Sequence, residues 1–191
     1  MRLSTSAALA ALLLCSGCAG VDLVTAGKSA DLGDGVSVVP PIAWARIHSP
    51  TGGSSLTIDG VGLGEVRYYT GVAPGKPIID IGALSNAEIG VYNASMLPNE
   101  IMDLLMSNLE KTGCQNARAA NLAPMKFGAA TGFRFDVSYL TKDGLEMKGE
   151  ALGAQRGGKL DLLLYVAPAE YYYALRKADV EQLFATVQTA G

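Results

Sequence analysis

Alternating hydrophobic and polar positions predict an antiparallel sheet in the second half of the chain. In "GFRFDVSYL", residues 132–140, every second side chain is apolar and the ones between are mostly polar. This period of two is typical of a strand with one buried face. An Asp143-Gly144 turn leads into a second strand over 145–155, and "RGGK" leads into a third over 160–168. We therefore expect a meander of three strands, with a candidate fourth over 116–127.

Helical periodicity predicts one helix over 98–112. Pro98 stands at its start and Gly113 supplies the stop, while apolar side chains gather on one face: Leu97, Ile101, Leu104, Leu105 and Leu109.

The C-terminal segment is also helical in pattern, but its apolar residues fall on two faces. One face holds Tyr171, Ala174, Leu175 and Ala178, and the other holds Val180, Leu183, Phe184 and Val187. Nine steps of about 100° separate Tyr171 from Val180 and place them on opposite sides of one helix. We expect the helix to break near Lys177-Ala178 rather than to be buried on both sides.

The first half contains shorter strand candidates. "VSVVPPIAWARI", residues 36–47, is either an edge strand broken at Pro40-Pro41 or two short strands. Further candidates cover 55–60 and 65–72, and 73–95 is interpreted as a loop with a short helix. This order of elements predicts an α+β fold in which helices cover the faces of an antiparallel sheet.

The N-terminus has the pattern of a secretory signal peptide. Arg2 is followed by an apolar run over 7–15 and by small residues. The run has nine residues, whereas a helix that spans a bilayer needs about 20.

The segment Cys15-Ser16-Gly17-Cys18 resembles a bacterial lipobox, with Cys15 where leucine is usual. The resemblance implies that the thiol of Cys18 carries diacylglycerol, that cleavage occurs before it, and that its new amino group is acylated. The C-x-x-C spacing also occurs in redox dithiols, but these need a preceding strand and a helix, and cleavage would remove Cys15.

This interpretation divides the chain into a signal peptide over 1–17, the lipidated cysteine with a flexible tether over 18–35, and one globular domain over 36–191. The tether is small, polar and rich in glycine, and would hold the domain on the order of 20–25 Å from the anchor. Ala19 stands where aspartate favours retention at the inner membrane, so the resemblance implies the periplasmic face of the outer membrane.

Charge and cysteine content exclude some partners and bonds. The whole chain has a net charge of −3, which argues against nucleic acid because phosphate binding needs clustered lysine and arginine. Cys114 is the one cysteine outside the N-terminal pair, so the mature chain has no internal disulfide. We expect Cys114 to behave as a small buried hydrophobe.

Known catalytic and metal-binding patterns do not occur in the sequence. His48 is the one histidine, and we expect a surface residue rather than a catalytic base. One histidine and one available cysteine cannot form the usual zinc sites, so neither a metal nor a cofactor is expected. The glycines at 60, 62 and 64 do not match the dinucleotide fingerprint, which favours a flexible turn.

The tyrosines are the strongest candidates for a recognition site. Tyr171, Tyr172 and Tyr173 are consecutive, so on a helix they point about 100° apart and cannot all enter one core. Exposed tyrosine suits contacts with a partner protein. The alternative is that two of them pack under the sheet edge while one reaches solvent.

The element order, together with the lipoprotein signal, resembles the PsbP-like and DcrB-like α/β/α sandwich, in which helices flank a curved antiparallel sheet. The resemblance covers about residues 36–189 and implies no functional residues. We expect a lipid-anchored envelope protein that binds or scaffolds an envelope partner without catalysis. A protein that binds a lipid or small molecule between sheet and helix is the alternative, followed by a small enzyme based on carboxylates.

Overall fold

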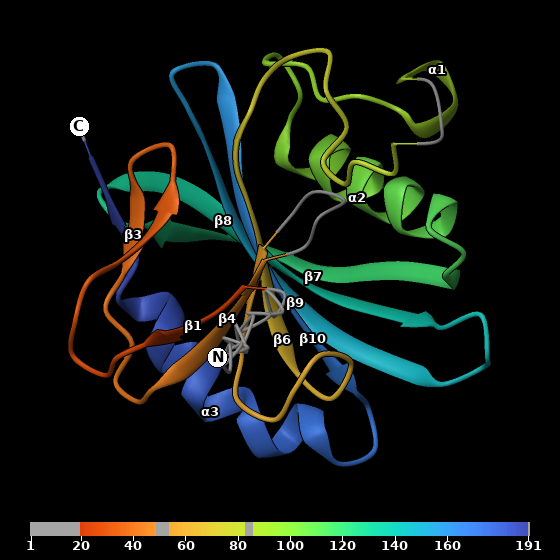
Figure 1. Ribbon diagram of the computed structural model, residues 1–191. Coiled ribbons are helices and arrows are strands. Elements are labelled where there is room, and N and C mark those ends of the chain that lie inside the picture. Colours follow the sequence, from red (N-terminus) through yellow and green to blue (C-terminus); the bar gives the residue numbers. More distant parts are fainter. Residues whose placement is uncertain (1–19, 49–53, 83–85, 191) are drawn as a thin grey trace, which may run out of the picture.

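The computed structural model describes residues 20–48, 54–82 and 86–190, and its main element is an antiparallel sheet of eight strands (Figure 1). The signal peptide and Cys18 lie outside the described residues. The strand order is β1-β4-β5-β6-β10-β9-β8-β7. The strands are β1 (Val21–Val24), β4 (Trp44–His48), β5 (Ser54–Thr57), β6 (Glu65–Val72), β7 (Gln115–Phe127), β8 (Ala130–Leu140), β9 (Glu146–Arg156) and β10 (Lys159–Pro168).

The predicted meander is confirmed, including its fourth strand. β7, β8, β9 and β10 pair in chain order, each antiparallel to the next. Residues 36–47 form two short strands, β3 (Val36–Val38) and β4, which belong to different sheets. β3 is the middle strand of a small sheet with β2 (Ala30–Gly33) and β11 (Gln188–Thr189).

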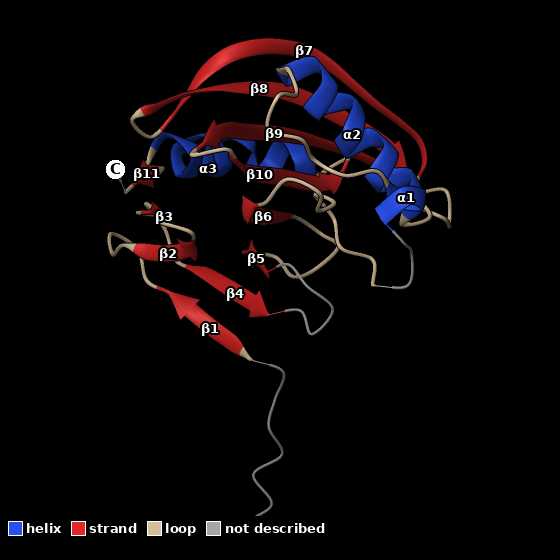
Figure 2. Cartoon of the chain, turned by 90° about the horizontal axis from the view of Figure 1, so that it is seen from above, coloured by secondary structure: helices blue, strands red, loops and turns tan. Residues whose placement is uncertain are grey.

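Two helices cover opposite faces of the large sheet, as predicted (Figure 2). α2 (Pro98–Lys111) buries Ile101, Leu105 and Leu109 in one core. α3 (Tyr172–Ala185) buries Val180 and Leu183 in a second core, which the small sheet shares. Alternation along β8 supplies the first core with Phe133, Phe135, Val137 and Tyr139.

The predicted flexible tether over 18–35 is wrong for its described residues. β1 starts at Val21 and pairs with β4, and β2 pairs with β3, so the globular fold begins well before residue 36. The segment looked like a tether because these strands have only four residues each and are separated by a glycine turn. β1 depends on β4, which lies farther along the chain, whereas β2 and β3 form a hairpin across Asp34-Gly35 that joins β11 near the C-terminus.

The interval 73–95 is held by a buried asparagine of α2. It contains the short helix α1 (Asn86–Ile89). The Asn108 side-chain carbonyl accepts from the backbone N–H groups of Ile78 and Ile79 at 2.9 and 3.2 Å, and its amide donates to the Ile89 carbonyl at 2.7 Å. One side chain thus replaces the backbone partners that this irregular segment lacks.

The predicted break near Lys177-Ala178 is wrong, because α3 is continuous from Tyr172 to Ala185. The first apolar face is not a buried face: Ala174, Leu175 and Ala178 are exposed. The first half of α3 contacts the sheet through aromatic and charged side chains instead.

Candidate functional site

A groove lies between α3 and the outer strands of the meander. α3 packs on β9 and β10, so the same face of β7 and β8 is left partly uncovered. We call this surface the α3 groove. Its larger hollow has a volume of about 480 Å³ and is lined by Met125, Lys126, Gly128, Arg134, Leu152, Glu181, Phe184, Ala185 and Val187. A smaller hollow of about 180 Å³ lies farther along the same strands and is lined by Arg118, Ala119, Ala120, Asp136, Val137, Ser138, Lys148, Gly149 and Tyr173.

A buried ion pair lies in the floor of the α3 groove. Strand alternation sends Phe133 and Phe135 to the α2 side and therefore Arg134 to the α3 side. There Arg134 pairs with Glu150 of β9, whose side chain is only 2% exposed. Burial raises the pKa of the Glu150 carboxyl, and the charge of Arg134 partly offsets that rise.

Arg134 also connects the sheet with α3. Its guanidinium lies 3.8 Å from the carboxylate of Glu181, which is half exposed on the helix. Farther along the floor, the Asn121 amide donates to the Asp136 carboxylate at 2.6 Å. The side chains that line the two hollows include four cationic ones and two anionic ones, although the whole chain carries a net negative charge. The cationic ones are Arg118, Lys126, Arg134 and Lys148, and the anionic ones are Asp136 and Glu181.

The predicted tyrosine surface is divided by the structure. Tyr171 is 62% exposed, whereas Tyr172 and Tyr173 pack partly against the α3-side core. The ring of Tyr173 stacks on Tyr165 with centroids 5.6 Å apart, and the Tyr165 hydroxyl donates toward the carbonyl oxygens of Tyr172 and Tyr173 at 3.2 Å each. Only Tyr173 of the three lines the α3 groove. A recognition role for the triplet stays a prediction, with Tyr171 as its exposed member.

His48 lies between an aspartate and a serine on the surface. Its Nε2 is 2.8 Å from the Asp22 carboxylate and its Nδ1 is 3.4 Å from the Ser54 hydroxyl. The order of groups resembles a hydrolytic triad, but the orienting carboxylate of such a triad is buried. Here the side chains of Asp22 and His48 are 65% and 46% exposed, so water screens the pair. The contact between His48 and the Ser54 hydroxyl is also long for a hydrogen bond. The arrangement is a surface hydrogen-bond chain, as expected for His48.

A second polar cluster lies at the α2-side face of β6 and was missed by the sequence analysis. The Arg67 Nε and Nη2 donate to one oxygen of the buried Glu65 at 3.0 and 2.6 Å. Burial raises the pKa of Tyr139 to about 12 and also raises the pKa of Tyr69. Cys114 is half-buried beside this core, so it fits the expected apolar role only in part. The charged residues Glu65 and Arg67 alternate with Val66 and Tyr68. This alternation is the sequence feature that could have predicted a polar cluster on one face of β6.

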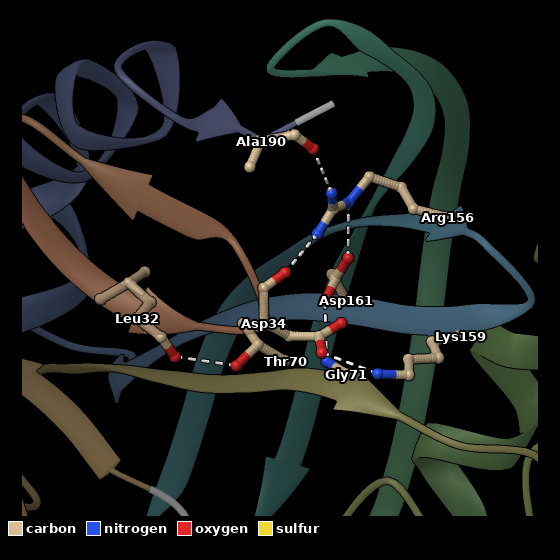
Figure 3. A network of polar contacts seen from close by, with 8 residues as sticks. All are labelled: Leu32, Asp34, Thr70, Gly71, Arg156, Lys159, Asp161 and Ala190. Carbon is tan, nitrogen blue, oxygen red and sulfur yellow. Dashed lines mark hydrogen bonds and ion pairs between the residues drawn. The ribbon is translucent and has the colours of Figure 1, made fainter.

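A third network joins the small sheet to the β9–β10 hairpin (Figure 3). Asp161 is fully buried and accepts from Gly71 N–H and from Arg156 Nε, both at 2.8 Å. The other nitrogens of Arg156 donate to the carbonyl oxygens of Asp34 and Ala190 at 3.0 and 3.2 Å. Each charged group has a partner in the fold, so this network is structural.

The part of the chain that the structure describes has neither a metal-ligand cluster nor a membrane-spanning helix. Within 20–48, 54–82 and 86–190, no three histidine, cysteine or carboxylate side chains are grouped so as to hold a metal ion. Within the same ranges, every helix falls short of the length and hydrophobicity that a bilayer span requires.

Comparison with known proteins gives structural neighbours only. No protein-family model and no curated protein matches the sequence. The solution structure of cyanobacterial PsbP (CyanoP) from Synechocystis sp. PCC 6803 is similar with a TM-score of 0.51 and 15% identity, over 92% of this chain and 95% of that one.

Two crystal structures are similar at lower scores. One, from Bacteroides thetaiotaomicron, has a TM-score of 0.48 and 11% identity over 82% of this chain and 46% of its own. The other is LpqN of Mycobacterium tuberculosis, described as involved in cell envelope biogenesis, with a TM-score of 0.38 and 10% identity over 90% of this chain and 83% of its own. At these identities a likeness concerns the fold, and of these three scores that of CyanoP exceeds one half. The chain therefore has an α+β fold similar to that of PsbP, with helices on both faces of a large antiparallel sheet.

Proposed function

We propose that this protein is a lipid-anchored envelope protein, facing the periplasm, that binds a partner protein in the α3 groove without catalysing a reaction. The observation that carries the proposal is the groove itself, which combines an apolar hollow with a cationic rim on a chain of negative net charge. The lipobox-like segment ending at Cys18 supports the location.

The shape of the α3 groove suits an extended segment of a partner. The two hollows follow β8 from Arg134 to Ser138 and β7 from Arg118 to Lys126. At about 3.3 Å per residue, the five residues of β8 span about 16 Å and the nine residues of β7 span about 30 Å, which suits an extended partner segment of similar length. An apolar side chain of the partner would enter the larger hollow beside Phe184, and acidic groups would meet Arg118, Lys126 and Lys148 at the rim.

A small amphiphile is the second candidate ligand, and the volume of the larger hollow favours it. Pockets for small molecules measure about 300–1,000 Å³ and are mostly apolar with a few polar groups. The 480 Å³ hollow falls in this range, with Met125, Leu152 and Phe184 as apolar lining and Arg134 beside them.

Site-specific photocrosslinking tests the groove. A photoreactive residue at Met125 should capture one defined envelope protein, and one at Leu175 should not. The two side chains are matched, since they are 43% and 42% exposed, but Leu175 lies on the outer side of α3. Met125→Asp should weaken binding of the captured protein at least about tenfold, as expected for loss of about 1.4 kcal/mol. Leu175→Asp should leave it unchanged.

Equal capture at both positions, or unchanged binding by Met125→Asp, would contradict the proposed groove. A ligand that native mass spectrometry detects on the wild type and not on Met125→Asp would favour the amphiphile instead. The anchor is tested separately: intact mass should show acyl chains on Cys18, and Cys18→Ala should leave the membrane fraction.

A further inference from the structure

The first described strand begins almost at the proposed anchor. Val21 starts β1, and only Ala19 and Gly20 stand between it and Cys18. Consecutive Cα atoms are 3.8 Å apart, so the Cα atoms of Cys18 and Val21 are separated by at most about 11 Å. Acyl chains on Cys18 would therefore hold β1 at the membrane surface. This inference rests on the proposed lipidation of Cys18.

The face of β1 that continues the α2 side of the sheet is apolar and open. Val21 and Leu23 point to this face and are 60% and 74% exposed. Their register partners on β4 are Ile47 and Ala45, which are half-buried. The alternate residue of β1, Asp22, points to the other face, where it contacts His48. We call these four apolar residues, Val21, Leu23, Ala45 and Ile47, the β1 strip.

The described fold leaves the outer half of the β1 strip, Val21 and Leu23, largely uncovered. β1 is one edge of the large sheet, and α2 packs over β7 at the opposite edge (Figure 2). Exposed sheet edges usually carry charged residues that prevent association; β1 has Asp22 on its other face, but on this face it presents two large aliphatic side chains. Four side chains are too few for a stable dimer, which needs about 800 Å² from each partner.

We propose that the β1 strip contacts the lipid bilayer beside the acylated Cys18. Val21 and Leu23 would enter the headgroup region, while Asp22 and His48 would stay on the aqueous side of the same edge. β1 and β8 are six strand spacings apart, or about 29 Å along the sheet at about 4.8 Å each. The anchored edge and the α3 groove thus lie at opposite ends of the sheet, which leaves the groove accessible to a periplasmic partner.

Tryptophan quenching in vesicles tests the contact. The lipidated variants Leu23→Trp, Asp22→Trp and Leu145→Trp are reconstituted into phosphatidylethanolamine/phosphatidylglycerol vesicles that contain brominated lipids. Asp22 is the control for the face of β1, and Leu145 is an exposed control in the distant β8–β9 turn. The native Trp44 is buried, and its signal in the lipidated wild type is subtracted from that of each variant. We expect quenching at position 23 to exceed that at 22 and at 145 several-fold.

Equal quenching at all three positions would overturn the proposal. So would a blue-shifted emission at position 23 without lipid quenching, because it would mean that a second copy or the protein itself covers the strip. If intact mass shows no lipid on Cys18, the proposed function fails independently. The strip is then tested with the chain from residue 18, carrying Cys114→Ala and coupled through the Cys18 thiol to maleimide lipids.

Discussion

At the residue scale, the most consequential side chains are charged groups that the sheet buries. Glu150 is 1% exposed, and its carboxylate forms an ion pair with Arg134. The guanidinium of Arg134 also lies near the carboxylate of Glu181. Because the pKa of Glu150 is higher in the folded chain than in the unfolded one, the folded state holds more protons between the two pKa values. Ionisation of Glu150 therefore lowers the free energy of unfolding as pH rises through that window.

Replacing Arg134 should reveal the free-energy cost of burying the ionised Glu150 carboxylate. Arg134→Ala is expected to lower the free energy of unfolding by about 3 kcal/mol near neutral pH, because an unpaired carboxylate is left buried. The loss should shrink at about pH 4, close to the ordinary pKa of glutamate, where Glu150 is protonated. Urea unfolding at the two pH values measures the difference.

Two further variants test whether the buried carboxylate causes the stability loss in Arg134→Ala. Arg134→Ala combined with Glu150→Gln should recover most of the stability, since the buried charge is gone. Glu181→Gln removes only an exposed and distant partner and should cost less than about 1 kcal/mol. A loss in Arg134→Ala that is the same at both pH values would argue against a buried carboxylate as its source.

At the scale of elements, α3 shows how one helix can combine two kinds of contact. Its second half buries Val180, Leu183 and Phe184. Its first half is held by polar contacts: Arg176 forms a two-pronged ion pair with Asp59 at 2.6 and 2.7 Å, and this hydrogen-bonded pair lowers the pKa of Asp59. Tyr173 adds its stacking on Tyr165. The helix therefore needs no continuous apolar stripe.

A proline at the predicted break distinguishes a continuous helix from a broken one. Ala178 is exposed within α3, so Ala178→Pro removes a helical hydrogen bond and should cost about 3 kcal/mol. Ala178→Gly at the same position should cost only about 1 kcal/mol. Thermal or urea unfolding followed by circular dichroism provides the measurement. A proline variant as stable as the glycine variant would mean that the chain is not helical there.

At the scale of the whole molecule, the Arg156–Asp161 network joins parts that are far apart in sequence. It connects β10 and β6 with the turn after β2 and with the end of β11 (Figure 3). Gly71 has a φ of 68°, and a Cβ there would meet Asp34 at 2.7 Å, so the close approach requires glycine.

Breaking this network should destabilise the small sheet relative to the rest of the fold. Asp161→Asn leaves the Arg156 guanidinium without its buried carboxylate and should cost about 3 kcal/mol. Hydrogen exchange should become faster at Val36–Val38 and Gln188–Thr189, which pair only within the small sheet. Lys159→Ala is the control, because its ion pair with Asp34 is partly exposed and should contribute less than about 1 kcal/mol. Unchanged exchange in Asp161→Asn would show that the small sheet is held by its apolar core alone.

Elements whose signals are local can be predicted from the order of the amino acids alone. The meander follows from strict alternation and short turns, and α2 follows from an apolar stripe bounded by Pro98 and Gly113. These features suffice for the α+β class, because each depends on neighbours a few residues away. The lipobox resemblance at Cys18 is also local and remains a prediction.

Which segments join these elements, and where a site forms, depends on contacts in the folded chain. β1 is too short to be stable alone and becomes a strand because β4 pairs with it, and the β2–β3 hairpin becomes a sheet because β11 pairs with it from the C-terminus. The α3 groove exists because α3 covers β9 and β10 but leaves β7 and β8 open, and the buried Arg134–Glu150 pair joins two strands. These features depend on contacts between distant residues, whose free energy no local pattern contains.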